Sequence, residues 1–359
     1  MIITYLAIII ALFFALNIGG SGAAAAISVA YGSGAIKSQK KALILCGLAI
    51  FAGAVIGGSE VVKTIGTGII PQDLLSVKIV LIILFSAAIS LFIANLLGIP
   101  LSTSEITVGA VVGVGIAYKA LYINNILVII SFWLLVPGSA FVIAIVAGKF
   151  IQMVERKFPK LKRPETQRII AVFVIIIGFF EAFSAGMNNV ANAIGPLVGG
   201  NIISIEKGII LGGLFTALGV VLLGKHVMET NGKKITRFSL LEGGAISGTG
   251  AFLVILSSIC GLPVPLTQVT STAIMGIAAA QKGASVLKKN IISKILKVWI
   301  VSPIFSLVIS YGLVKVVVDM DIYSLFVLLS VCASTLGVIS LLNTIKEEKR
   351  VYQENGGGI

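Results

Sequence analysis

Eleven apolar runs follow one another along the chain, and short polar segments separate them. Most runs are about 20 residues long, which is the length that a helix needs to cross the hydrocarbon core of a bilayer. The pattern predicts an all-α integral membrane protein with about eleven crossings. The runs occupy residues 2–35, 42–58, 76–97, 99–118, 122–148, 169–200, 208–224, 239–260, 262–281, 295–318 and 322–343.

The runs at 2–35 and 169–200 are too long for a single crossing. They contain 34 and 32 residues, or about 50 Å of helix at 1.5 Å per residue, whereas the hydrocarbon core is about 30 Å thick. Gly19–Gly22 lies in the middle of the first run and Gly186–Asn189 in the middle of the second. Because both runs exceed one crossing and glycine interrupts helix patterns, we expect both to break or re-enter at these segments.

Composition supports a membrane location and narrows the function. The chain has 27 basic and 14 acidic residues, so only 11% of its 359 residues are charged, and 57% are apolar. Three cysteines exclude a disulfide scaffold, and a single histidine argues against a zinc site. We expect no cofactor and no metal. A membrane-embedded enzyme is disfavoured, because the sequence offers no nucleophile–base pair and no metal cluster.

Lysine and arginine alternate between two sets of loops. One set holds 22 of the 27 basic residues and the other holds five. Because basic residues accumulate in cytoplasmic loops, this split predicts a multi-pass protein of the cell membrane with its N-terminus outside and its C-terminus in the cytoplasm. The basic residues stand in short clusters between apolar runs, which argues against nucleic-acid binding despite the net charge of +13.

Short blocks of sequence recur in the same order in the second half of the chain. Gly58–Gly66 matches Gly224–Gly232 and Trp133–Pro137 matches Trp299–Pro303, both at a shift of 166 residues. We expect two copies of a five-crossing unit, of which the second is inverted because five is odd. Inverted repeats with interrupted helices are typical of secondary transporters. The predicted boundaries are 1–148 for the first repeat, 149–168 for a basic cytoplasmic loop, 169–318 for the second repeat and 319–359 for a C-terminal helix and tail.

Four polar or glycine- and proline-rich segments lie inside the apolar runs, at Gly19–Gly22, Pro100–Glu105, Gly186–Asn192 and Pro263–Thr272. Each can begin a half-helix, whose free N–H groups and positive dipole end bind anions. We therefore expect an anion near the midplane; the alternative is that small polar residues only join neighbouring helices. The candidate substrate-binding residues are Ser21, Gly22, Ala23, Ser102, Thr103, Ser104, Asn188, Asn189, Asn192, Thr267, Gln268 and Thr270.

Two carboxylates, Glu105 and Glu181, lie well inside apolar runs. An ionisable group inside a membrane is costly, and it is a functional hypothesis by default. We expect both side chains to bind and release protons during transport. The alternative is that one or both anchor an interrupted helix by accepting backbone hydrogen bonds.

Two motifs resemble those of the inorganic phosphate transporter (PiT) family. They are Gly186-Met-Asn-Asn-Val-Ala-Asn192 and Gly98-Ile-Pro-Leu-Ser-Thr-Ser104. The resemblance covers essentially the whole chain, and it implies an inverted-repeat anion transporter that forms a homodimer in the bilayer. It also implies anion-site roles for Asn188, Asn192, Ser102, Thr103 and Ser104.

The chain departs from the family motifs at several positions. The motif aspartate is Gly22 in the first copy and Asn189 in the second, and the motif histidine is Glu105 in the first and Gln268 in the second. The first copy also lacks both motif asparagines, and the second has Pro265-Leu266 in place of Ser-Thr. The segments 17–26, 31–36 and 181–189 resemble those of the CysP-type sulfate permease branch of the family.

The departures favour sulfate as the substrate. Phosphate near neutral pH keeps a P–OH group that an aspartate can accept, whereas sulfate offers only acceptors and is repelled by a carboxylate. We expect proton-coupled import of sulfate, with thiosulfate and selenate as related oxyanions. Loss of the two carboxylates argues against sodium coupling. The alternatives are a phosphate transporter driven by sodium or protons, and a passive anion channel.

Overall fold

The computed structural model describes residues 1–96, 101–233, 238–283, 289–321, 323–324, 326–327 and 330. The chain divides into two compact units, of which the first ends at Ser310 and the second begins at Tyr311. The run predicted at 322–343 and the motif at 98–100 lie largely outside the described residues.

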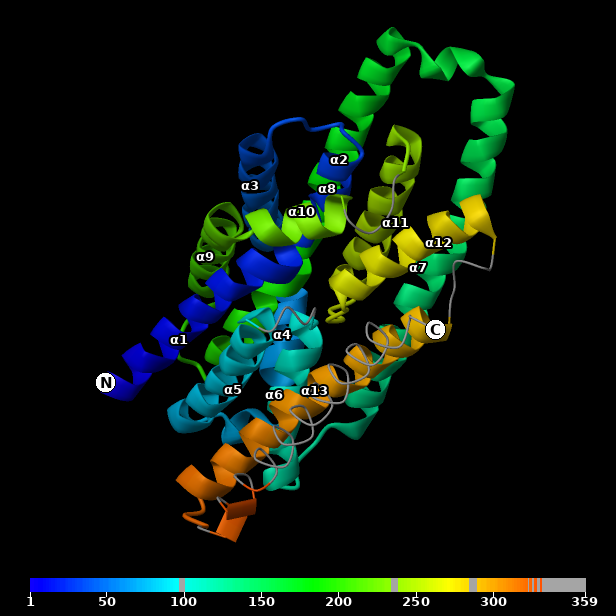
Figure 1. Ribbon diagram of the computed structural model, residues 1–359. Coiled ribbons are helices and arrows are strands. Elements are labelled where there is room, and N and C mark those ends of the chain that lie inside the picture. The colour runs from blue at the N-terminus through cyan, green and yellow to red at the C-terminus, as the bar shows by residue number, and fades with distance from the viewer. Residues whose placement is uncertain are drawn as a thin grey trace, which may run out of the picture. The chain divides into compact units, whose positions relative to one another are not determined.

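Each apolar run within the described residues forms at least one helix (Figure 1). Eight helical segments in that part of the chain are long and apolar enough to cross a membrane, which confirms an all-helical membrane protein. The count of eleven crossings stays a prediction. The α-helices are α1 (Ile2–Ile18), α2 (Ser28–Gly32), α3 (Gln39–Gly57), α4 (Ser59–Thr67), α5 (Val77–Leu96), α6 (Thr103–Ala117), α7 (Ile123–Lys157), α8 (Pro164–Gly199), α9 (Ile205–Leu223), α10 (Lys225–Lys233), α11 (Leu240–Ile259), α12 (Leu266–Lys282) and α13 (Lys289–Val317). The shorter elements are a π-helix, Gly19–Ala23, and the 3-10 helices Gln72–Leu74 and Pro159–Lys162.

The helices recur as two series in the same order. α3 and α9 have 19 residues each, and both bounds of α9 lie 166 positions after those of α3. α10 likewise begins 166 positions after α4. α6 and α12 have 15 and 17 residues. The recurrence matches the repeated sequence blocks in spacing and in order.

The predicted break at Gly186–Asn189 is wrong, because α8 runs unbroken for 36 residues (Figure 1). Gly186 serves close packing rather than a break. A Cβ at this position would lie 2.0 Å from the carbonyl oxygen of Ile50 on α3, so only glycine lets the two backbones approach this closely. At 1.5 Å per residue, α8 is about 54 Å long and extends beyond a 30 Å hydrocarbon core.

The predicted interruption in the first run is present, a few residues later than expected. α1 passes into the π-helix Gly19–Ala23, and the helical chain ends in a turn at 26–27 before the short α2. A π-helix inside an α-helix is rare and is frequent at functional sites.

α1 crosses α9 in the same way that α8 crosses α3. A Cβ at Gly19 or at Gly219 would lie 2.1 Å from a carbonyl oxygen of the facing helix. The corresponding distances are 2.0 Å at Gly186 and 1.9 Å at Gly53. α1 therefore packs against α9, and α8 against α3, through paired glycines in each case.

In the second unit, the chain after α13 is fixed by short-range polar contacts. Lys315 Nζ lies 2.7 Å from Asp319 Oδ2, and Asp321 accepts hydrogen bonds from the backbone of Tyr323 and the hydroxyl of Ser324. These contacts hold the turn that follows the helix.

Candidate functional site

Asn188 on α8 joins the ends of two helical hairpins, α5–α6 and α11–α12. Its Oδ1 accepts hydrogen bonds from Ser104 Oγ at 3.3 Å and from the Val264 N–H at 3.2 Å. Its Nδ2 donates to Ser258 Oγ and to the Leu262 carbonyl, both at 3.1 Å. All four hydrogen-bonding positions of the amide are in use, so one buried side chain braces both hairpins.

Asn189 and Asn192 extend this bracing to the start of α6. Thr103 Oγ1 donates to Asn189 Oδ1 at 3.4 Å, and Asn192 Nδ2 lies 3.3 Å from both Thr103 Oγ1 and Ser104 Oγ. Asn192 Oδ1 is buried and has no hydrogen-bond partner among the described residues. Because the two ends of an amide have the same shape, turning Asn192 over would present its NH₂ group as a free donor.

α6 begins inside this polar cluster. Ser102 is its N-cap, and its Oγ accepts a hydrogen bond from the Glu105 N–H at 3.5 Å. The N–H groups of Thr103 and Ser104 have no carbonyl earlier in the helix to bind, and the positive end of the helix dipole points the same way. The start of α6 therefore has the anion-binding geometry that the sequence predicts.

The π-helix brings Gly22 to the same cluster. A Cβ at Gly22 would lie 3.4 Å from Thr267 Cγ2 and 4.0 Å from Thr103 Cγ2. Gly22 thus lies beside the first turns of α6 and α12, and a Cβ atom would fit there in ordinary van der Waals contact. Ser21 is oriented differently, because its Oγ donates to the Asn17 carbonyl of its own helix at 2.8 Å.

The cluster is enclosed by protein. The side chains from Ser102 to Ser104 and the three asparagines are at most 4% exposed, whereas Thr267 is half-buried. No lysine or arginine occurs in residues 17–27, 101–109, 181–196 or 257–272, the segments that surround it. An anion bound here would be held by N–H, O–H and amide donors rather than by cations.

Glu105 and Gln268, the two positions where the motif histidine is replaced, form a hydrogen-bonded pair. Gln268 Nε2 on α12 donates to Glu105 Oε1 on α6, and both side chains are buried. Glu105 Oε2, Gln268 Oε1 and the hydroxyl of Ser302 on α13 have no hydrogen-bond partner in the described part of the chain. Gln268 thus contacts the carboxyl group across the hairpin junction.

Glu181 on α8 is bound separately from Glu105. Thr270 Oγ1 donates to Glu181 Oε1 at 2.9 Å, and Gly250 on α11 faces the same oxygen. Glu181 Oε2 is buried without a hydrogen-bond partner among the described residues. Both carboxylates therefore accept side-chain hydrogen bonds from α12, and within the described part of the chain no cation lies beside them.

The structure brings together Gly22, Thr103, Ser104 and the asparagines of α8, as the sequence predicts. The hydrogen bonds of Ser21, Gln268 and Thr270 instead go to Asn17, Glu105 and Glu181. Sequence reasoning missed Ser258, and it missed that Trp133 Nε1 on α7 donates to the Pro263 carbonyl at 2.9 Å. The signal for Trp133 was present, because this tryptophan lies in one of the repeated sequence blocks.

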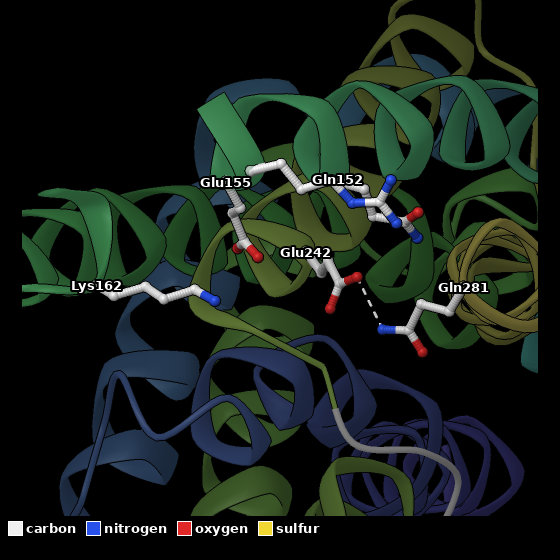
Figure 2. Close-up of a pocket in the computed structure, with 6 residues that line it drawn as sticks. Gln152, Glu155, Lys162, Glu242 and Gln281 are labelled. Atoms are coloured by element: carbon white, nitrogen blue, oxygen red, sulfur yellow. Dashed lines mark hydrogen bonds between the residues drawn. The ribbon is translucent and has the colours of Figure 1, made fainter. Parts of the chain in front are cut away.

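A second polar region lies at the far ends of α11 and α12 from the hairpin tip, and Figure 2 shows it. Glu242 Oε1 accepts from Gln281 Nε2 at 2.8 Å, and Glu155 Oε1 accepts from the hydroxyl of Ser239, the N-cap of α11, at 2.9 Å. These bonds link α7, α11 and α12. The region, called here the polar cavity, has a volume of about 330 Å³ and is lined by Gln152, Glu155, Arg156, Lys162, Glu242 and Gln281.

Comparison with known proteins identifies the family. The model of the phosphate transporter family matches residues 18–310. The chain belongs to this family. It is 56% identical to the sulfate permease CysP of Bacillus subtilis over 353 residues, which cover 98% of this chain and 99% of that protein. The family membership confirms a multi-pass transporter and the prediction that the protein is not an enzyme.

The family's fold is also present in a solved structure. That structure, titled the sodium-dependent phosphate transporter, is matched over 88% of this chain and 99% of its own chain, with a TM-score of 0.74 and 24% identity. At this identity the likeness shows a shared fold, and the substrate must be argued from the residues of the site.

Proposed function

We propose that this member of the phosphate transporter family imports sulfate through the cluster at the start of α6. The relative with 56% identity is named a sulfate permease, and the cluster offers donors without cations. The observation that carries the proposal is Gly22. It lies against Thr103 and Thr267 with room for a Cβ atom, yet it places no carboxylate where the family motif has an aspartate.

The chemistry of the two anions supports this choice. Sulfate presents only acceptor oxygens, so backbone N–H, hydroxyl and amide donors match it, and a buried carboxylate beside it would be an uncompensated repulsion. The first turn of α6 supplies N–H donors, and the side chains of Thr103, Ser104 and Asn192 would supply further donors by turning from their present protein partners toward the anion. Ser102, Asn188 and Asn189 hold these groups in place. Thiosulfate and selenate share the same acceptor-only surface.

The proposed topology consists of two inverted repeats, at 1–148 and 169–318, joined by the basic loop 149–168 and followed by the segment 319–359. The matching lengths of the paired helices support it, as do the four glycine contacts that relate α1–α9 to α8–α3. In this proposal the hairpins α5–α6 and α11–α12 enter from opposite faces and meet near the midplane, and Ser104 Oγ donates to the Val264 carbonyl at 3.2 Å where they touch. A re-entrant hairpin returns to the face where it began. Re-entry of both hairpins would therefore lower the predicted count of eleven crossings by four, while each basic loop keeps its predicted side.

Labelling from one side of the membrane tests this topology. In a cysteine-free background, Lys160→Cys should react with an impermeant thiol reagent only from the cytoplasmic side, and Asp321→Cys only from outside. The opposite pattern would overturn the orientation, and reaction of both cysteines from the same side would overturn the inverted-repeat arrangement. The homodimer implied by the resemblance stays a prediction.

Protons are the proposed driving ion. A dianion that enters against about 100 mV costs roughly 4.6 kcal/mol, so a passive channel would leave sulfate outside. Two protons per sulfate make import electroneutral, and three make it driven by the potential. Glu105 and Glu181 are the proposed carriers, because both are buried and neither faces a cation.

Uptake into proteoliposomes tests the function. Labelled sulfate and labelled phosphate are compared under an inward proton gradient, an inward sodium gradient and no gradient. We expect sulfate to accumulate with the proton gradient alone. Phosphate accumulation that exceeds sulfate accumulation would favour the phosphate transporter instead, and sulfate flux that no gradient can concentrate would favour the channel.

A further inference from the structure

The Glu105–Gln268 pair joins the two hairpins at a point that sulfate binding does not require. Glu105 lies in the first turn of α6 and Gln268 in the first turn of α12. The side chains are 2% and 5% exposed, so neither is solvated. This buried hydrogen bond therefore helps to hold the two hairpins together.

The hydrogen bonds of the pair do not balance if Glu105 is ionised. Gln268 Nε2 donates to Glu105 Oε1, which leaves Glu105 Oε2 and Gln268 Oε1 as two buried oxygens without hydrogen-bond partners in the described residues. An ionised carboxylate and an amide carbonyl only accept hydrogen bonds. Turning the amide over would set its oxygen against Glu105 Oε1, which also requires a proton between the two.

Glu181 shows the contrasting case. Thr270 donates to its Oε1, and the Ser247 hydroxyl lies beside its carboxyl group. The hydroxyls of Thr270 and Ser247 can rotate to donate to the Glu181 carboxylate, so both of its oxygens can accept a hydrogen bond when Glu181 is ionised. Beside Glu105, the Ser302 hydroxyl can donate to the carboxyl group, but Gln268 Oε1 is then still without a donor.

Among the described residues, no cation lies beside Glu105. α12 has no titratable residue before Lys282 in its last turn, and α6 has none besides Glu105 itself. From α13 the neighbouring groups are the hydroxyls of Ser302 and Ser306, and the buried titratable residue of α8 is Glu181. A buried carboxylate without a cation is strongly disfavoured.

We propose that Glu105 is protonated in this structure and forms an acid–amide pair with Gln268 that fastens α6 to α12. The Glu105 Oε2–H bond supplies the missing donor, and Gln268 Oε1 accepts it. Loss of that proton to water leaves carboxylate and amide oxygens facing each other, which weakens the junction between the hairpins. Gln268 is thus a positioning residue for the proton site and not an anion ligand. This inference deepens the proposed proton coupling.

Infrared difference spectroscopy on the protein in lipid tests the proposal. The carbonyl band of a protonated carboxylic acid should be present in wild-type protein at neutral pH. Glu105→Gln should abolish it, whereas Glu181→Gln should leave that component intact. Gln268→Met, of similar length, should shift the band because the acid loses its amide partner, and Gln268→Asn provides a second, polar variant.

Each outcome decides between the alternatives. If Glu105→Gln removes no protonated-acid band, Glu105 is ionised and the proposal is wrong. If neither Gln268 variant shifts the Glu105 band, the pairing is wrong. The test is independent of transport: a Glu105 band together with sulfate uptake that ignores the proton gradient would refute the proposed coupling and keep this inference. Proton-driven sulfate uptake without a Glu105 band would keep the proposed proton coupling and refute the acid–amide pair.

Discussion

α1 with its π-helix and α8 begin the two series of helices, and they pack alike while differing in chemistry. Each crosses the second helix of the other series through paired glycines. α8 continues without a break and places three asparagines in the site, whereas α1 unwinds at Gly19–Ala23 and contributes Gly22. The glycine crossings are therefore shared by the two series of helices, whereas the residues that form the polar cluster are not. In this chain the side-chain donors of the cluster come mainly from α8 and the start of α6.

The two hairpins α5–α6 and α11–α12 likewise resemble each other in fold and differ in the side chains that they contribute. α6 starts with serine and threonine hydroxyls, while α12 starts after Pro265 with Leu266. The matched positions Glu105 and Gln268 bind each other across the junction. A symmetric fold thus carries an asymmetric site, with one ionisable group at the junction. Four comparisons between the two sides test this division.

The largest effect is expected at Asn188. Asn188→Ala leaves buried groups of both hairpins, including the Val264 N–H, without partners, at about 1–3 kcal/mol each. We expect sulfate uptake to fall by more than about 100-fold, the equivalent of ~2.8 kcal/mol. Gly22→Ala on the α1 side is the matched control, because there is space for the methyl group. Asn188→Ala protein that keeps most of its uptake would end the claim that α8 organises the site.

The second-largest effect on sulfate uptake is expected when a carboxylate is introduced at Gly22 on the α1 side. Two unit charges 4 Å apart interact by about 4 kcal/mol at an effective dielectric of 20, so Gly22→Asp should strongly weaken sulfate uptake. Gly22→Asn has nearly the same shape without the charge and should keep most of the uptake. Initial rates of both variants are measured with sulfate and with phosphate. Equal losses in the two variants would assign the effect to shape and refute the role of the missing aspartate.

Removal of one proton carrier should have a more limited effect. A proton that moves down a gradient of one pH unit supplies ~1.4 kcal/mol, or about tenfold accumulation. Glu105→Gln and Glu181→Gln should each lower gradient-driven sulfate accumulation by about this factor while sulfate exchange continues. Accumulation and exchange are measured in the same proteoliposomes. Full accumulation in both variants would show that protons travel elsewhere.

The smallest effect is expected at the polar cavity, away from the site. Gln281→Leu removes its hydrogen bond to Glu242, worth about 0.5–1.5 kcal/mol, and should change the uptake rate by only severalfold. Lys162→Gln, which lines the same cavity, is the control for charge. A loss as large as that of Asn188→Ala would move the functional centre to this end of α11 and α12.

Hydrophobic periodicity predicts the helices because apolar length and bilayer thickness fix them locally. The starts of α6 and α12 were also predictable, from the proline, serine and threonine that precede a helix. The continuity of α8 was not predictable, because Gly186 reads as a breaker in sequence and only the facing Ile50 carbonyl shows its packing role.

The pairing of site residues is a tertiary property. Nothing in the spacing of Gln268 and Thr270 indicates that each binds a carboxylate from a different helix. The roles of Ser258 and Trp133 depend likewise on hairpin ends that are brought together from distant parts of the chain.

The most direct test is a structure determined with selenate, whose selenium locates the anion unambiguously. The account predicts the anion near the midplane, within hydrogen-bonding distance of the N–H groups at the start of α6 and of donors from Thr103, Ser104 or Asn192, with Gly22 alongside. An anion held by Arg156 and Lys162 in the polar cavity, with the midplane cluster empty, would contradict it.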